Sequence, residues 1–203
     1  MPANDESRAY ALSILGAVTW GQATAIVVPI VVALMGVLGA YFYNTALARR
    51  KDRLDRINRQ LSELYGPLLS LVAASSRSWE VFRSRYRPGG AYWDRDPPPT
   101  PDETEAWRLW MSEVFMPLND RMAELVVTKA DLLESRDLPS CLLDLVAHVE
   151  SYRAVTAAWR QGDYRENRAP LNFPREALQQ YAEECFSQLK ARQEILLRDT
   201  GRR

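Results

Sequence analysis

ATAIVVPIVVALMGVLGAYFY, residues Ala23 to Tyr43, is the stretch on which the fold depends. It contains no charged residue, and none occurs anywhere between Arg8 and Arg49. At about 1.5 Å per residue, a helix of this stretch would be about 31 Å long, which matches the hydrocarbon core of a bilayer. A soluble core helix of this length normally carries a polar face, and this stretch has none. The sequence therefore predicts a transmembrane helix.

The residues that flank this span indicate its orientation. Trp20 lies at one end and Tyr41 and Tyr43 at the other, where aromatic rings favour the headgroup level. The basic residues that follow the span are Arg49, Arg50, Lys51, Arg53 and Arg56. Because cytoplasmic flanks are enriched in Lys and Arg, the C-terminal side is predicted to be cytoplasmic. A cleaved secretory signal fits poorly, since its basic residues would precede the apolar run.

We therefore predict three parts in the chain. Residues 1–19 form a short extracytoplasmic or interfacial N-terminus, residues 20–45 form the transmembrane helix, and residues 46–203 form a cytoplasmic helical domain. The basic flank has two interpretations: it contacts anionic lipid headgroups, at about 1 kcal/mol for each cation, or it only determines topology. Gly36 and Ala40 form a small-xxx-small pair, which favours close helix packing but is also common in transmembrane helices.

Overall composition excludes several classes of site. The formal net charge is zero, so no global basic field attracts nucleic acid. Cys141 and Cys185 are expected to be reduced thiols in a cytoplasmic domain. Structural zinc needs four Cys or His ligands, and the chain has two cysteines and one histidine. No metal and no cofactor is expected.

The remaining chain reads as four helices, at 46–86, 101–127, 139–161 and 173–198. Thr100, Pro101 and Glu103 form a capping box at the second start. Gly66-Pro67 predicts a kink or break in the first helix. Polar loops between amphipathic helices favour an antiparallel, four-helix-like bundle, so the fold class is all-α.

A heptad pattern begins beyond the span. Leu47, Leu54, Leu61 and Leu68 recur every seven residues, and Ile57, Leu64 and Leu71 repeat at the same period, offset by three. Such a stripe is typical of a coiled coil, and it leaves two interpretations open. Either two chains form a parallel dimeric stalk, or the stripe packs onto the bundle of its own chain.

His148 is the first candidate for chemistry. Asp144 lies four residues before it and Tyr152 four residues after it, so either side chain could orient the imidazole as a general base. Cys141 is about 10.5 Å away along the same helix, too far to form a dyad within it. No nucleophile is identifiable, although Cys185 could approach in space. His148 and Asp144 are thus weak catalytic candidates, and a structural histidine is the other interpretation.

Polar residues near helix ends form a second candidate group. Asn119, Lys129 and Asp131, with His148 and Tyr152, could build a buried polar network at one end of the bundle. The other interpretation is that Asn119, Lys129 and Asp131 are ordinary caps and turn residues.

Several segments together resemble a family of uncharacterised, small, single-span bacterial inner-membrane proteins with a cytoplasmic helical domain. The segments are RINRQLSELYGPLLSLV, WMSEVFMPLNDRM, KADLL, PSCLLDLVAHVESYRAV and LNFP. The resemblance covers most of residues 50 to 198. It implies a bacterial inner membrane as the location and brings no known activity, so no catalytic residue is carried over.

The function favoured by these observations is a membrane-tethered interaction or regulatory module. Its expected partners are the lipid bilayer and either another protein or a second copy of the chain, with no nucleic acid. Two alternatives belong to other classes: a membrane-perturbing effector of the toxin or phage-defence type that acts through its span, and a membrane-anchored enzyme that uses His148.

Overall fold

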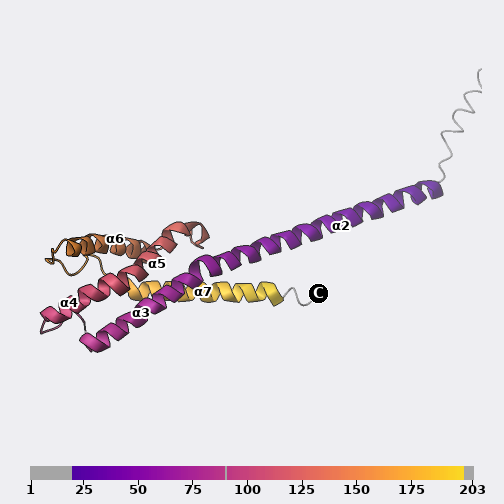
Figure 1. Ribbon diagram of the computed structural model, residues 1–203. Coiled ribbons are helices and arrows are strands. Elements are labelled where there is room, and N and C mark those ends of the chain that lie inside the picture. Colours follow the sequence, from indigo (N-terminus) through magenta and orange to yellow (C-terminus); the bar gives the residue numbers. More distant parts are fainter. Residues whose placement is uncertain (1–19, 90, 199–203) are drawn as a thin grey trace, which may run out of the picture. The chain divides into compact units, whose positions relative to one another are not determined.

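Helices make up all the regular structure in the part of the chain that the computed structural model describes, residues 20–89 and 91–198 (Figure 1). They are α2 (Trp20–Arg59), α3 (Gly66–Tyr86), α4 (Pro101–Trp110), α5 (Met116–Thr128), α6 (Ser140–Arg160) and α7 (Arg175–Arg198). Two π-helical segments, Gln60–Tyr65 and Met111–Phe115, and a short 3-10 turn, Ala130–Leu132, connect some of them. This confirms the all-α class. The predicted N-terminal segment 1–19 lies outside the described residues.

The chain divides into two compact units, Met1–Asp52 and Arg53–Arg203. In the first unit α2 is helical through Pro29, and its apolar side chains are exposed, as at Val37 (67%) and Phe42 (67%). The helical run Val27–Tyr86 contains a window of mean hydropathy 1.8 that is not buried at all. By length and composition this helix can cross a membrane, and a buried soluble core helix would not expose such a surface.

Each π-helical segment ends two residues before a proline. Pro67 and Pro117 are the second residues of α3 and α5, and the amides of Gly66 and Met116 donate to the carbonyls of Leu61 and Met111, five residues back. A proline inside a regular helix removes one hydrogen bond and clashes with the carbonyl four residues earlier. The wider turn accommodates it. At the kink or break expected near Gly66, the structure therefore has a π turn in an unbroken helical run.

Glycine is required at the first of these turns. A Cβ atom on Gly66 would lie 2.5 Å from the carbonyl oxygen of Leu61, far inside van der Waals contact. The π turn brings this oxygen toward the face of residue 66, and only a residue without Cβ leaves room for it.

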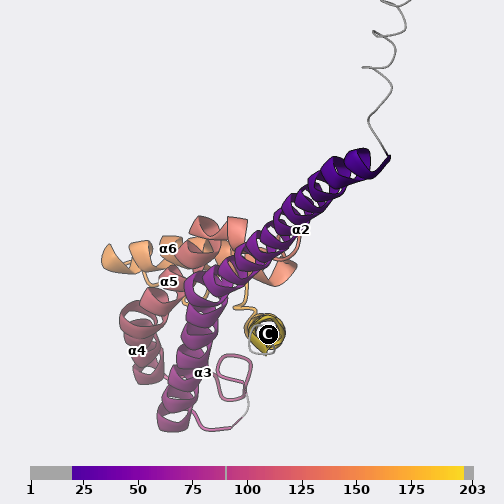
Figure 2. The same cartoon turned by 90° about the vertical axis from the view of Figure 1, so that its right-hand side faces the viewer.

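Within the second unit, α3 packs against α5 and α7, and α6 packs against the same two helices. Figure 2 shows α7 end-on beside α3. Leu64 and Leu68 are completely buried, and Leu61 and Leu71 are nearly so. From Leu61 onward the heptad stripe therefore packs onto its own chain, as the second interpretation held. Leu47, before it, is 54% exposed.

Candidate functional site

A cavity of about 310 Å³ lies within the second unit. This volume is at the lower end of the range for small-molecule sites, about 300 to 1,000 Å³. Three helical regions line it together with two loops, 161–174 and 87–100, of which the second is described at residues 87–89 and 91–100, and α7 contributes its first residue. Aromatic, basic and polar side chains line it together, among them Ser75, Trp79, Arg83, Tyr92, Trp93, Asp94, Trp107, Phe115, Asn119, His148, Tyr152, Arg168, Leu171, Phe173 and Arg175.

Aromatic rings form one wall of the cavity. The ring centroid of Trp79 lies 5.9 Å from that of Trp107 and 6.0 Å from that of Phe115, both edge to face. Phe82, which is fully buried, lies behind them, 5.1 Å from Tyr92 and 5.7 Å from Trp107. Rings at these separations attract each other and lock one another in place. The wall is therefore rigid and presents aromatic faces to the cavity.

The floor of the cavity is polar. Asn119 of α5 and His148 of α6 are 3% and 4% exposed. His148 Nδ1 lies 2.6 Å from the carbonyl oxygen of Leu171. A carbonyl only accepts, so Nδ1 donates and Nε2 is left as an acceptor in the neutral ring. The Asn119 Oδ1 atom is buried with no hydrogen-bond partner among the described residues.

Tyr152 packs against the histidine. Its ring centroid is 5.0 Å from that of His148, and burial raises the pKa of Tyr152 to about 12, opposed by a hydrogen bond with the Ala169 backbone. Burial also lowers the pKa of His148, opposed by the hydrogen bond with Leu171. Both side chains are therefore neutral at physiological pH.

Two guanidinium groups face the same indole. The guanidinium carbon of Arg83 lies 5.7 Å from the Trp79 ring centroid, and that of Arg175 lies 5.1 Å from it. Neither forms an ion pair with a carboxylate within the described chain, and Arg83 Nε and Arg175 Nη1 have no hydrogen-bond partner there. Burial lowers the pKa of Arg175; Glu80 opposes this shift, while the charge of Arg83 adds to it. Positive charge is thus concentrated at this side of the cavity.

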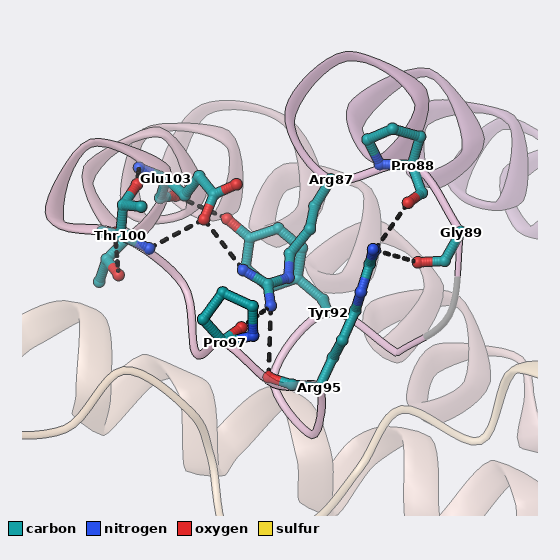
Figure 3. Close-up of polar contacts among 9 residues, drawn as sticks. Arg87, Pro88, Gly89, Tyr92, Arg95, Pro97, Thr100 and Glu103 are labelled. Carbon is teal, nitrogen blue, oxygen red and sulfur yellow. Dashed lines mark hydrogen bonds and ion pairs between the residues drawn. The ribbon is translucent and has the colours of Figure 1, made fainter.

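Arg87 holds the first loop closed, as Figure 3 shows. Its side chain is 7% exposed and lies 3.0 Å from the Glu103 carboxylate of α4. The same guanidinium donates to the carbonyls of Arg95 and Pro97. Tyr92 Oη donates to the Glu103 carbonyl at 2.6 Å. These bonds fix the loop that carries Trp93 and Asp94 to the cavity.

The second loop is held by indole groups. Trp107 Nε1 donates to the Asn167 carbonyl at 2.8 Å, and Trp159 Nε1 donates to the Glu166 carbonyl at 2.7 Å. Gly162 lies near the start of the loop, and its φ of +79° is a left-handed conformation that favours glycine. Arg168 then forms a 3.2 Å ion pair with Asp94 of the first loop. The two loops therefore meet at the solvent side of the cavity.

The structure brings together three of the five residues of the sequence-derived polar group. Asn119, His148 and Tyr152 all line the cavity. Lys129 and Asp131 lie elsewhere, where Lys129 pairs with Glu63 at 2.9 Å. They follow the C-terminus of α5, away from Asn119 in its first turn. The sequence indicated that all three residues lie near helix ends, but it did not show that Asn119 lies at the opposite end of α5 from Lys129 and Asp131.

The suggested Asp144–His148 pair does not form. Asp144 is exposed, and the imidazole is oriented by the Leu171 carbonyl instead. Leu171 belongs to the loop after α6, so this contact depends on tertiary folding. Cys185 does not line the cavity and packs in a separate apolar cluster with Tyr181. In residues 20–89 and 91–198 no group of three potential ligands could hold a metal ion.

The basic flank and the small-residue pair are both accessible. Arg49, Lys51, Arg53 and Arg56 are exposed, and Arg50 is half-buried. Arg53 and Arg56 also line a groove of about 420 Å³ in the second unit, with Arg192 and Ile195. A Cβ on Gly36 would meet nothing within 4 Å, and Ala40 is exposed, so this helix face is open to a neighbouring helix or to lipid.

The pKa of His148 makes stability dependent on pH. Its folded pKa is lowered, so the unfolded chain binds the proton more tightly, and stability is lost as pH falls below about 6.5. We expect the melting temperature of the full chain to fall from pH 7.5 to 5.5. In His148→Asn the amide nitrogen can still donate to Leu171 but does not titrate, so the fall should be smaller. If the melting temperatures of the wild type and of His148→Asn fall equally between pH 7.5 and 5.5, the prediction is contradicted.

The chain matches no family model, and comparison with curated proteins and with solved structures finds no match either.

Proposed function

We propose that this chain is a single-span membrane protein whose helical domain is a tethered regulatory module, controlled by a small molecule bound in the cavity. One exposed apolar helix supports the anchor. The basic residues that follow it support a cytoplasmic domain and an N-terminus outside, and the family resemblance supports a bacterial inner membrane as the location. The regulated partner is another protein or a second copy of the chain.

The observation that carries the proposal is the unpaired Asn119 Oδ1 on the cavity floor. A buried polar atom without a partner costs about 1–3 kcal/mol. The fold retains this cost at a cavity of ligand size, where a bound molecule would remove it.

Binding is favoured over catalysis by the partners of His148. Its Nδ1 atom is committed to a backbone carbonyl, and the carboxylate that could have oriented it, Asp144, is exposed. Cys185, the thiol that could have served as a nucleophile, packs in another cluster. The polar groups on the floor are arranged to hold a molecule.

A cavity-filling variant tests the proposed binding. The detergent-solubilised full-length protein is incubated with a small-molecule extract of its expression host and weighed by native mass spectrometry. Ser75 is 3% exposed and lines the cavity, so Ser75→Leu should fill it. Ala74→Leu introduces the same side chain on the exposed face of the same helix turn. We expect a small-molecule adduct on the wild type and Ala74→Leu and none on Ser75→Leu. The proposal fails if no protein carries an adduct or all three do.

Reporter fusions test the proposed topology. Green fluorescent protein fused after residue 203 should fluoresce, and alkaline phosphatase at the same position should be inactive, because that end is proposed to be cytoplasmic. Active phosphatase with a dark fluorescent fusion would reverse the orientation and leave the ligand site untouched.

A further inference from the structure

We infer that the ligand of this cavity is a small organic anion, a carboxylate or a phosphate ester, with a planar apolar body and a hydrogen-bond donor at its other end. The inference rests on the proposed function and names the chemical class of the ligand. Three features of the cavity carry it: two cations that form no ion pair within the described residues, two acceptor atoms on the floor, of which Asn119 Oδ1 is unpaired there, and an aromatic wall.

The cations require an acidic group. Arg83 and Arg175 lie on one indole ring and repel each other, and neither forms an ion pair within the described chain. The charge of Glu80 acts on Arg175, but Glu80 is exposed and pairs with Arg77. Placing two positive charges together at a partly buried site is costly unless an anion joins them. Their unpaired donors, Arg83 Nε and Arg175 Nη1, can bind the oxygens of a carboxylate or phosphate. The third cation of the cavity, Arg168, is already paired with Asp94.

The floor requires a donor on the ligand. Asn119 Oδ1 has no partner, and the Nε2 atom of His148 is an acceptor because Nδ1 donates to Leu171. An amine, hydroxyl or ring N–H would satisfy these atoms, whereas a second acidic group would meet acceptors only. The ligand is therefore acidic at one end and a donor at the other.

The wall and the volume define the body between these ends. Trp79, Trp107 and Phe115 present aromatic rings that favour stacked or edge contacts with a planar molecule. A cavity of about 310 Å³ suits a ligand of one or two rings. A long acyl chain or a full dinucleotide would not fit within it.

Four probes separate these requirements on the full-length protein in a non-ionic detergent, with binding followed by tryptophan fluorescence and calorimetry. They are 4-hydroxybenzoate, which has both ends; benzoate, which lacks the donor; 4-hydroxybenzamide, which lacks the charge; and phenyl phosphate. We expect 4-hydroxybenzoate to bind at least about tenfold more tightly than benzoate or the amide. Tighter binding of phenyl phosphate than of benzoate would identify a phosphate ester as the acidic end.

Matched variants assign the contacts. Arg83→Gln and Arg175→Gln should each weaken 4-hydroxybenzoate binding at least about tenfold, whereas Arg121→Gln, an exposed arginine of α5 outside the cavity, should change nothing. Asn119→Leu should abolish the preference for 4-hydroxybenzoate over benzoate. Because Asn119 Oδ1 is unpaired, this variant is also expected to melt at or above the wild-type temperature, which separates lost binding from lost folding.

Failure of this inference differs from failure of the proposed function. If the neutral amide binds as tightly as the acid, the anion class is wrong and the regulatory site stands. If no probe binds but the native mass still shows an adduct that Ser75→Leu removes, the ligand belongs to another class. If no probe binds and no adduct forms, both proposals fall.

Discussion

Replacing Phe82 with alanine is expected to destabilise the Arg53–Arg203 unit by about 4 kcal/mol, within the range for Phe to Ala in a closed core. Phe82 is completely buried, and the ring centroids of five other side chains lie 5.1 to 5.8 Å from its own. These rings come from α3, from α4 and from loop 87–100, so they cannot collapse together into the space that the missing ring would leave.

The measurement is thermal unfolding of the full-length protein in detergent, followed by tryptophan fluorescence so that the apolar span contributes little. For a domain of this size, about 4 kcal/mol corresponds to a melting temperature lower by roughly 8 to 16 °C. Phe82→Leu should cost about 1–1.5 kcal/mol, because leucine fills most of the space. Val81→Ala, at the neighbouring 45% exposed position, should stay within about 0.5 kcal/mol of the wild type. Equal melting of Phe82→Ala and Val81→Ala would contradict the packing described here.

Phe82→Ala should also weaken ligand binding without touching the ligand. The ring of Phe82 lies behind Tyr92 and Trp107, which line the cavity. Without the Phe82 ring behind them, the rings of the wall can move. Ligand binding must then order these rings again, and the entropy lost in doing so weakens binding. We expect Phe82→Leu to recover most of the binding that Phe82→Ala loses. That recovery would separate this effect from unfolding.

The helices could be predicted from the sequence because their signals are local. The capping box at Thr100 forms as expected, with Glu103 N–H donating to the threonine hydroxyl and the Glu103 carboxylate accepting from the Thr100 amide. The predicted segments 101–127 and 139–161 match α4–α5 and α6 within one or two residues at each end. Caps and apolar periodicity act over a few residues and need no knowledge of the fold.

The π turns could not be predicted in the same way. Gly66-Pro67 indicates a kink or a break, and the helical run instead continues through a wider turn. Whether a proline breaks, kinks or widens a helix depends on what holds the two sides in register. Here the flanking residues Leu64 and Leu68 are both fully buried in the domain, and that packing is tertiary.

Only some of the residues that line the cavity could be identified from the sequence. Asn119 stands out in the sequence as a polar residue near a helix end, and His148 and Tyr152 stand out because they lie four residues apart on one helix. Arg83 and Arg175 do not, since arginines are frequent in this chain and most belong to solvated surfaces. One local signal exists: Arg83 follows Trp79 by four residues, a spacing that places a guanidinium over a ring on the same helix face. The loop contacts, such as Leu171 with His148, carry no periodic signal.

Replacing Arg87 with methionine is expected to destabilise the same unit by about 3 kcal/mol and to free loop 87–100. Removing one partner of a buried ion pair costs about 3–5 kcal/mol, because the other charge stays behind unpaired. The lower end applies here, since the Glu103 side chain keeps 23% of its surface in water and still accepts from the Thr100 amide. Methionine preserves most of the volume, so the loss reports the polar contacts of Arg87.

A double-mutant cycle isolates the pair. Glu103→Gln can still accept from the Thr100 amide but lacks the charge, so Arg87→Met should cost markedly less in that background than in the wild type. Arg77→Met removes an ion pair with Glu80 in which both side chains are exposed, and it should change stability by less than about 0.5 kcal/mol. If Arg87→Met and Arg77→Met lower the free energy of unfolding by the same amount, Arg87 does not hold the loop.

Acid provides an independent check on the same contact. The hydrogen bond from the Thr100 amide, followed by Arg87, lowers the pKa of Glu103 below its usual value. A carboxyl group with a lowered folded pKa contributes stability above its unfolded pKa of about 4.3 and loses it as pH falls through the folded value. The stability difference between wild type and Arg87→Met should therefore be full at neutral pH and shrink in acid. Limited proteolysis gives a second measurement at neutral pH. Cleavage at the exposed Arg95 should be faster in Arg87→Met than in the wild type, because the loop then lacks the hydrogen bond from Arg87 to the Arg95 carbonyl.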